Sequence, residues 1–589
     1  MHRILRQLLA IVVGVVVTAI VSHFAPSLFD WIHHSSDAHL LMTFLSIAVV
    51  CVLSFAAFHF SEGTPLPSFV AAIFFGIAGR ELLTPITHEH GTLAAIVGFG
   101  ATLILFSGGL ETPFASFRKL LVKILSLSFF GLFLTAFLFS WSLFEIGLWV
   151  GISVPVTVAV LLGAVLASTD PAAIIPVLKQ LRFKNRETKD IIISESAVTD
   201  VTGTLLTLVF LGVIGAAGAF TSINSGYGTL FTAATGWILL EQIAFGVLFG
   251  VMGYGLLVGL TRFKSYHAQE YEADAAFFVG VPVIIFTIAV ALGGSGYLAA
   301  FIAGLLYVIT KHLHTTERFF NHMIEGFLKP TIFILLGALV DVQSLLDTAV
   351  VGILAGLVFM GIIRPLTVFL TLGPFSFFGK DRFSIRELWF ISFVRETGAI
   401  PAVLLVTIVS SGITGLDNLV PIGMWVILLT LVIQPALTPL VARWLKVAVP
   451  MADAAAIQLH NIEKPMVVLG SRGHSYVDRL PRVVAWALRH NIDHVMLLHC
   501  LEDQYTTQRE AAMRAETESA FKKINAAQAE KGEPEIEFHY VSRTGFLQQN
   551  IAALAAEHES VSAIFVGRKI LDFRLEEIKQ LQVPLFFID

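Results

Sequence analysis

The feature that most constrains this chain is a series of about fourteen apolar runs between residues 8 and 446, each long enough to cross a bilayer as a helix. A hydrocarbon core about 30 Å thick needs about 20 apolar residues per helical crossing. Of all residues 56% are apolar and 14% are charged, whereas soluble domains carry about 25% charged residues. We therefore expect a polytopic α-helical membrane domain over residues 1–450.

The distribution of lysine and arginine supports this number of spans and gives it an orientation. Loops that face the cytoplasm carry an excess of both residues. Here the basic residues fall in alternate loops, and the other loops carry essentially only Arg80. This predicts a multi-pass protein of the bacterial inner membrane with both termini in the cytoplasm. The basic groups include Arg118, Lys119 and Lys123, then Lys179, Arg182, Lys184, Arg186 and Lys189, and later Lys380, Arg382 and Arg386.

The first apolar segment, about residues 8–24, follows Arg3 and Arg6, which is also typical of a cleaved secretory signal. The pattern of small residues at a cleavage site is weak after it. We therefore expect the segment to be retained as the first span.

After about residue 450 the composition changes, and apolar strand-like segments alternate with helical stretches. This rhythm is typical of a parallel, doubly wound sheet. We expect a soluble cytoplasmic α/β domain at 464–589, joined by a linker at 451–463. Its predicted strands are Pro465–Ser471, His494–His499, Glu535–Val541, Ala563–Gly567 and Leu585–Ile588.

Ionisable residues inside the apolar runs are costly, so each is a candidate functional residue. One group surrounds Pro171, which has no N–H and disfavours helical geometry at the residue before it. The sequence Thr169-Asp170-Pro171 therefore predicts a broken helix, whose freed carbonyls can hold an ion. The alternative is a proline kink in which Asp170 only caps a half-helix. The full set is Asp170, Glu195, Asp200, Arg364, Arg395 and Glu396, with Glu111 near the end of a span.

The next span carries a second polar group, in which Ser196 and Asp200 lie four residues apart on one helix face. Two carboxylates, serine and threonine hydroxyls with that of Thr199 among them, and freed carbonyl oxygens form a hard oxygen site that suits a dehydrated alkali cation. A carboxylate removed from water favours a bound cation or proton over its bare charge, so the two can compete for it. The alternative is a structural hydrogen-bond network.

Buried basic residues need acidic partners. Glu195 and Arg364 both fall in the cytoplasmic half of their spans, and we expect them to pair. The segment that contains Arg395 and Glu396 also loosely echoes residues 169–178, in an oppositely directed span. Such an echo is typical of an inverted-topology repeat.

Several motifs together resemble the NhaP-type branch of the monovalent cation:proton antiporters, over most of residues 90–440. They are Phe106-Ser107-Gly108-Gly109-Leu110-Glu111, Thr169-Asp170-Pro171, Glu195-Ser196 with Thr199-Asp200, Gly294-Ser295-Gly296-Tyr297-Leu298-Ala299, Phe301-Ile302-Ala303-Gly304-Leu305, Arg364-Pro365, and Phe383-Ser384-Ile385-Arg386-Glu387 leading to Arg395.

The resemblance implies a homodimer with a scaffold and a mobile six-helix core that contains two broken helices. It implies that the transported alkali cation and the proton compete at Asp200, with Asp170, Ser196 and the Thr169 carbonyl as further ligands. It also implies a Glu195–Arg364 bridge and a water-mediated contact of Glu111. Two positions depart from the family pattern: Thr199 stands where the family usually has Asn, and Glu396 lies beside Arg395. A single carboxylate at positions 199–200 favours electroneutral one-for-one exchange.

The tail resembles a universal-stress-protein-like α/β domain. Members that bind ATP carry a Gly-rich phosphate loop after the fourth strand, but here Gly567 is followed by Arg568 and Lys569 without a Gly-x-x-Gly pattern. We therefore expect neither a nucleotide nor another cofactor, and a small-molecule regulator of the tail stays open.

The sequence thus predicts a secondary transporter that exchanges Na⁺ or K⁺ for H⁺ by alternating access, with the lipid bilayer as its environment. The net charge of −5 does not indicate a nucleic-acid partner, and we find no nucleophile–base pair or catalytic metal cluster typical of an enzyme. Two alternatives stay open: a cation channel or efflux system gated by the tail, and a membrane-anchored nucleotide sensor.

Overall fold

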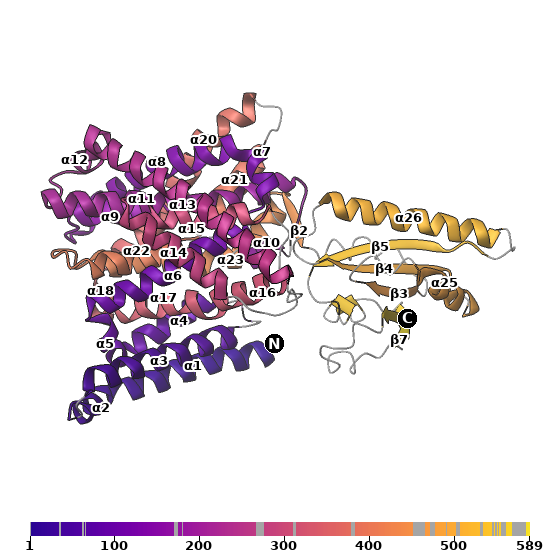
Figure 1. Cartoon of the computed structure of the whole chain (residues 1–589), viewed down its shortest axis with the longest axis horizontal. Coiled ribbons are helices and arrows are strands. Elements are labelled where there is room, and N and C mark those ends of the chain that lie inside the picture. The colour runs from indigo at the N-terminus through magenta and orange to yellow at the C-terminus, as the bar shows by residue number, and fades with distance from the viewer. Residues whose placement is uncertain are drawn as a thin grey trace. The chain divides into compact units, whose positions relative to one another are not determined.

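A computed structural model describes the chain in segments (Figure 1). The described residues are 2–34, 37–61, 64, 66–169, 175–179, 181–266, 276–309, 314–378, 383–450, 466–471, 478–490, 492–501, 507–529, 534–544, 547, 550–551, 553–554, 561–567 and 585–588. The chain divides into two compact units. We call Met1–Leu178 with Phe183–Val447 the membrane unit, and Lys179–Arg182 with Ala448–Asp589 the C-terminal unit.

The membrane unit is built from helices. Its first half contains α1 (His2–His23), α2 (Ala25–Ile32), α3 (Ala38–Ser61), α4 (Ser68–Ala78), η1 (Arg80–Leu83), α5 (Thr84–Thr87), α6 (His90–Glu111), α7 (Phe114–Leu125), η2 (Ser126–Gly131), α8 (Leu132–Val150), α9 (Val156–Leu166), α10 (Ile175–Lys179) and α11 (Arg186–Ala217).

The second half contains α12 (Ile223–Gly228), η3 (Thr229–Phe231), α13 (Ala233–Tyr266), α14 (Ala276–Ala291), α15 (Gly296–Tyr307), α16 (His314–Met323), η4 (Ile324–Leu328), α17 (Lys329–Ala338), α18 (Val342–Asp347), α19 (Ala349–Val358), η5 (Phe359–Ile363), α20 (Arg364–Phe378), α21 (Ile385–Phe393), α22 (Ala399–Ser410) and α23 (Leu419–Trp444).

Within the described residues, eight helical stretches are long and apolar enough to cross a membrane, and one bent pair adds a ninth. The bent pair joins α4 to residues Arg80–Thr87 at 86°. Four shorter apolar helices are α9, α14, α15 and α22. The multi-pass helical architecture is therefore present, while the count of about fourteen spans stays a prediction.

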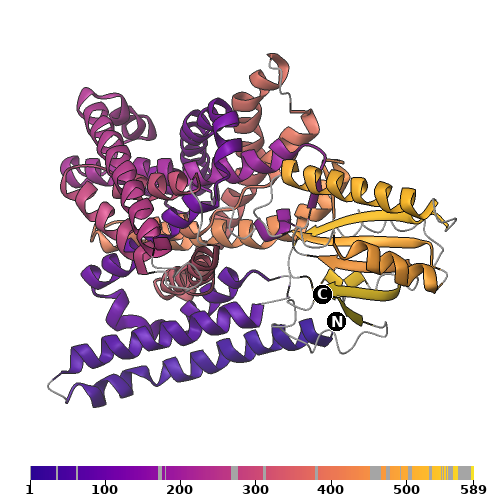
Figure 2. The same ribbon diagram turned by 45° about the vertical axis from the view of Figure 1, so that its right-hand side comes forward.

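The outward faces of these helices are apolar. Figure 2 shows the long helices α1 and α3 side by side at the start of the chain. On α1, Leu9 and Val16 are 59% and 52% exposed. On α3, Val52 and Phe55 are similarly exposed. A soluble protein would bury such a stripe, so these faces suit a hydrocarbon solvent.

Three local features recur in both halves of the membrane unit. The sequence Ser68–Gly76 of α4 and the sequence Gly296–Gly304 of α15 both place two alanines at the fourth and fifth positions and a glycine at the ninth. π-Helical turns interrupt the α7–α8 and α19–α20 stretches at η2 and η5. A helix also breaks in each half, after α9 and between α21 and α22. This correspondence extends the weak repeat visible in the sequence.

Glycines bring two helix pairs of the membrane unit into backbone contact. A Cβ atom on Gly76 of α4 would lie 2.1 Å from the Ile334 carbonyl oxygen of α17, and one on Gly337 would lie 2.3 Å from the Ile73 oxygen. Gly109 and Gly304 join α6 to α15 in the same way, at 2.4 Å and 2.3 Å from backbone oxygens. We call these two contacts the glycine seams. No side chain fits at either of them.

The C-terminal unit contains a five-stranded parallel sheet in the order β5-β4-β3-β6-β7. The parallel sheet expected for the tail is therefore present, and four of its five strands begin within two residues of the predicted positions while β7 matches its prediction. Its strands are β3 (Met466–Ser471), β4 (His494–Leu501), β5 (Glu537–Thr544), β6 (Val561–Gly567) and β7 (Leu585–Ile588); β1 (Leu181–Phe183) and β2 (Ala448–Pro450) form a separate two-stranded sheet.

Apolar layers cover both faces of this sheet. One layer joins alternate strand residues to α25 (Leu480–Arg489) and α26 (Thr507–Ala529), which Figure 1 shows running along the sheet. The other layer joins the intervening strand residues to Leu547, Ile551 and Leu554. The chain thus crosses to the opposite face between β5 and β6, as in a doubly wound sheet. The predicted linker at 451–463 lies outside the described residues.

Candidate functional site

The site is built where the chain leaves α9 and passes α11. Helix α9 ends at Leu166, and residues 167–169 are not helical. Residues 170–174 lie outside the described residues, and with them Asp170 and Pro171, so the role of Asp170 stays a prediction. Residues 167–169, which we call the non-helical segment, pack directly against α11. A Cβ atom added to Gly203 of α11 would lie only 2.7 Å from the Cβ of Ser168.

Asp200 lies in the middle of α11 and is buried. The Ser168 hydroxyl donates a hydrogen bond to its Oδ1 over 2.7 Å. The hydroxyl of Thr204 is used locally, donating to the Asp200 carbonyl oxygen over 2.7 Å. A carboxylate removed from water is stable only when such donors, a cation or a proton compensate its charge.

One helical turn before Asp200, three more polar residues form a hydrogen-bond network between the non-helical segment and α11. The Ser196 hydroxyl donates to the Thr169 carbonyl oxygen. The hydroxyls of Thr169 and Thr199 lie 2.8 Å apart, and Thr199 also donates to the Ser196 carbonyl. All three are buried. Thr199 is therefore in direct contact with the non-helical segment.

A charged cluster lies beside this hydrogen-bond network. Arg364 Nη2 donates to Glu195 Oε2 over 2.7 Å, so the structure brings together the two residues expected to pair. Arg395 Nη1 lies 4.0 Å from the other Glu195 oxygen, Oε1. All three side chains are at most 3% exposed. Losing one partner of such a buried pair costs about 3–5 kcal/mol, because a charge is left without compensation.

Arg395 connects this cluster to the end of α9. It lies in the break between α21 and α22, at residues 394–398, and donates to the Ala167 carbonyl oxygen. A cation at a helix C-terminus interacts favourably with the unsatisfied carbonyls there. Its guanidinium also lies 5.7 Å from the centre of the Phe359 ring. One side chain therefore contacts groups at both broken helices.

The second break is held by hydrogen bonds from α23. Gln434 Nε2 donates to the Phe393 carbonyl at the end of α21 over 2.8 Å. The Thr397 and Thr430 hydroxyls lie 2.5 Å apart. Glu396 is buried at the same break. Glu111, in contrast, is the last residue of α6 and its side chain is exposed.

Sequence reasoning missed several of these residues. Ser168 directly precedes the Thr169-Asp170-Pro171 motif, but its contact with Asp200 depends on how the chain turns after α9. Thr430 and Gln434 lie four residues apart on α23, so they share a helix face inside an apolar run, which could have indicated a polar contact.

The arrangement offers hard oxygen atoms and few other chemical groups. The Asp200 carboxylate, the Thr169 carbonyl and the hydroxyls of Ser168, Ser196 and Thr199 are the oxygens that the described residues bring together. Alkali cations are bound by oxygen ligands of this kind.

Known proteins provide an independent comparison. Residues 50–444 match the family "Sodium/hydrogen exchanger, transmembrane". The K⁺/H⁺ antiporter NhaP2 of Shewanella oneidensis is 28% identical over 369 residues, which cover 62% of this chain and 59% of that protein. The K⁺/H⁺ antiporter NhaP of Alkalimonas amylolytica is 26% identical over 427 residues, covering 69% and 68% respectively. The match to the Shewanella protein thus spans less than two thirds of its length.

A solved structure shows the fold. The sodium proton antiporter MjNhaP1 of Methanocaldococcus jannaschii, solved at pH 8, superposes with a TM-score of 0.57 at 21% identity. The superposition covers 69% of this chain and 99% of that chain. Since the family match extends over more than half of the sequence, the chain belongs to the transmembrane sodium/hydrogen exchanger family.

Proposed function

We propose that the protein exchanges a monovalent cation, Na⁺ or K⁺, for H⁺ across the membrane by alternating access. The observation that carries the proposal is the buried Asp200 carboxylate, which lies among hydroxyl and carbonyl oxygens beside a helix break. Family membership and relatives named as K⁺/H⁺ and sodium proton antiporters support it.

The exchange follows from competition for one carboxylate. A cation that enters the site replaces hydrogen-bond donors around Asp200 and brings its own charge, so the proton is no longer needed. A proton that binds Asp200 removes the negative charge, and the cation is released. Because Thr199 is neutral, one cation is exchanged for one proton, and the cycle is electroneutral. Asp170, Thr169 and Ser196 are the further ligands in this proposal.

The remaining expectations belong to the same proposal. The protein is a homodimer of the bacterial inner membrane with cytoplasmic termini, in which the Glu195–Arg364 pair stabilises the moving part. The C-terminal unit is a universal-stress-protein-like regulatory domain, and its strand order supports this. No tightly bound cofactor takes part.

The experiment that tests the proposal is ion-driven proton flux in proteoliposomes, with Na⁺, K⁺ and Li⁺ offered in turn. Asp200→Asn should abolish exchange, because an amide neither binds the proton nor compensates a cation. The matched control is Asp190→Asn, a buried acid on the same helix that hydrogen-bonds Ser116 and lies outside the site. Full exchange activity of the Asp200 variant would contradict the assignment of Asp200 as the residue that binds the cation and the proton.

The two alternative functions are separated by further measurements. A tail-gated channel would pass cations without regard to the pH gradient. A membrane-anchored sensor would show no coupled flux at all, and its membrane unit would have no reason to keep costly buried charges. Removing residues 451–589 should leave exchange in place but change its regulation.

A further inference from the structure

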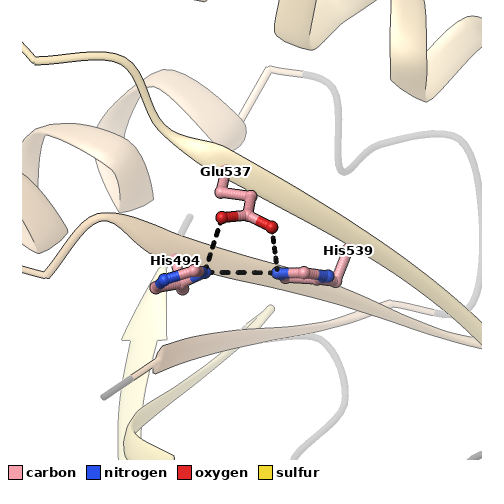
Figure 3. Close-up of side chains that lie close together, drawn as sticks. All are labelled: His494, Glu537 and His539. Carbon is pink, nitrogen blue, oxygen red and sulfur yellow. Dashed lines mark hydrogen bonds and ion pairs between the residues drawn. The ribbon is translucent and has the colours of Figure 1, made fainter. Parts of the chain in front are cut away.

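Two histidines and a glutamate lie together on the sheet of the C-terminal unit, far in sequence from the residues discussed so far. They are His494, the first residue of β4, and Glu537 and His539, at the start of β5 (Figure 3). One ligand atom from each falls within 4.8 Å of the other two. Strand pairing explains the meeting, because His494 is the register partner of Glu537 and Met496 is that of His539.

The cluster sits where one apolar layer of the sheet ends. On this face β4 presents His494, Met496 and Leu498, and β5 presents Glu537, His539 and Val541. Met496, Leu498 and Val541 pack in the apolar layer, whereas the residues at the amino ends of both strands are polar. Ligands of doubly wound sheets bind at the carboxyl ends of the strands. The cluster therefore lies at the opposite edge and needs its own explanation.

The distances between the three side chains fit a shared metal ion. His494 Nδ1 and His539 Nε2 are 3.3 Å apart. Two nitrogens bound at about 2.05 Å to a tetrahedral zinc ion are also about 3.3 Å apart. Glu537 Oε2 lies 3.6 Å from His494 Nδ1, and its Oε1 lies 3.9 Å from His539 Nε2. The carboxylate is largely exposed, so a small rotation brings it to ligand distance.

Burial, nearby charges and a backbone hydrogen bond all affect how the two histidines could bind a metal ion. Burial lowers the pKa of His539, with Glu537 acting in the opposite direction and nearby His494 in the same one, which favours the neutral, ligating form of the imidazole. His494 is only 6% exposed, and its second ring nitrogen, Nε2, lies 3.6 Å from Asp493 Oδ1. Nε2 makes no hydrogen bond within the described residues, so the Asp493 carboxylate would have to move closer to orient the ring as an outer-shell partner. A backbone hydrogen bond of 2.7 Å from Glu537 N to Asp493 O holds the two strand starts together.

We propose that His494, His539 and Glu537 bind one divalent transition-metal ion, with Zn²⁺ as the best match, in a three-ligand site whose fourth position is open to water. Two histidines and one carboxylate with an open position form a ligand set that Zn²⁺ accepts. The site clips β5, the edge strand of the sheet, to β4. The competing explanation is a simple hydrogen bond between the two imidazoles, which needs no metal.

The test is metal binding by the full-length protein, purified without a polyhistidine tag and stripped with a chelator. We expect one Zn²⁺ per chain by equilibrium dialysis. Co²⁺ should give the strong visible absorption of a tetrahedral site. His539→Gln and Glu537→Gln should weaken binding by at least the roughly 10–100-fold that loss of an outer-shell partner causes.

The matched control is His490→Gln, an exposed histidine of the same unit that stacks on Trp486 and lies outside the cluster. It should bind Zn²⁺ as the unaltered protein does. The substituted positions 537 and 539 are not fully buried, so these variants should fold, and elution as a single species in size-exclusion chromatography verifies it. Absence of stoichiometric Zn²⁺ in the unaltered protein, or unchanged affinity in His539→Gln, would overturn the proposal and leave the imidazole hydrogen bond as its explanation.

Discussion

The two units of this protein bury ionisable side chains in opposite ways. In the membrane unit, Glu195, Arg364, Arg395 and Asp200 lie in the interior of the helix bundle, at most 6% exposed. In the C-terminal unit, the described interior of the sheet is mostly aliphatic, with His499 and Arg543 as buried exceptions, and the His494 cluster lies at one end of the strands, where the Glu537 carboxylate is 67% exposed. A soluble sheet can place charge at its edges, where solvation costs little.

A membrane domain has no such edge within the hydrocarbon layer. Charge retained there must be compensated by other groups of the protein or by a transported ion. The comparison therefore separates structural charge from functional charge. Glu195 is paired directly with Arg364, whereas the Asp200 carboxylate accepts a hydrogen bond from the neutral Ser168 hydroxyl and also lies within electrostatic range of Arg395. Changing one group in each unit should reveal the difference.

The largest effect on stability is expected when Arg364 is replaced. Arg364→Met should destabilise the membrane unit by about 3–5 kcal/mol, because Glu195 then stays buried without its closest partner. Thermal unfolding of the purified protein measures the loss. The matched control is Arg443→Met near the exposed end of α23, which should change little.

The charge-reversed pair Glu195→Arg with Arg364→Glu separates compensation from simple packing. It should recover part of the lost stability, since the pair is restored. Recovery should be incomplete, because Arg395 lies 4.0 Å from the Glu195 carboxylate and would then face a like charge. No recovery at all would count against the pair.

An intermediate effect is expected at the contact between α11 and the non-helical segment. Gly203→Ala should cost about 1–3 kcal/mol, since the new Cβ would lie 2.7 Å from that of Ser168. Because the shift also displaces the Ser168 donor, proton exchange should fall along with thermal stability.

Gly212→Ala provides the control for this substitution. It lies on the same helix with nothing within 4 Å of its Cβ position, and it should be neutral or slightly stabilising. Equal thermal stability of the two alanine variants would mean that the close approach of the non-helical segment to α11 does not affect stability.

The smallest effect is expected in the C-terminal unit. Glu537→Gln, measured with a chelator present, should change stability by no more than about 0.5 kcal/mol, because the carboxylate is 67% exposed. The same exchange at Glu195 should be far more damaging. If Glu537→Gln and Glu195→Gln lowered stability by similar amounts, the distinction between the two units would be wrong.

Much of this architecture could be predicted because its cause is local. Apolar runs identify membrane helices, and a buried arginine demands an acid, so Glu195 could be matched to Arg364 across 169 residues. Alternation of apolar segments likewise predicted the strands of the tail. These features follow from the solvation of each residue and do not require knowledge of how the chain packs.

Other features depend on geometry that no short sequence window contains. The run around α4 reads as one span, yet it bends by 86° before Arg80. The contact of Ser168 with Asp200 depends on the path of the chain after α9. The His494 cluster requires the register of two parallel strands, which the intervening helix does not specify.

The glycine seams have a mechanical consequence for any cycle of this protein. Where two backbones touch, neither helix can rotate or slide without driving a side chain into the other, so α6 with α15 and α4 with α17 behave as single stiff parts. When one helix of such a pair is displaced, the other must move with it. In the proposed cycle, the pivots must therefore lie elsewhere, and residues 167–169 and 394–398 are non-helical candidates within the described chain.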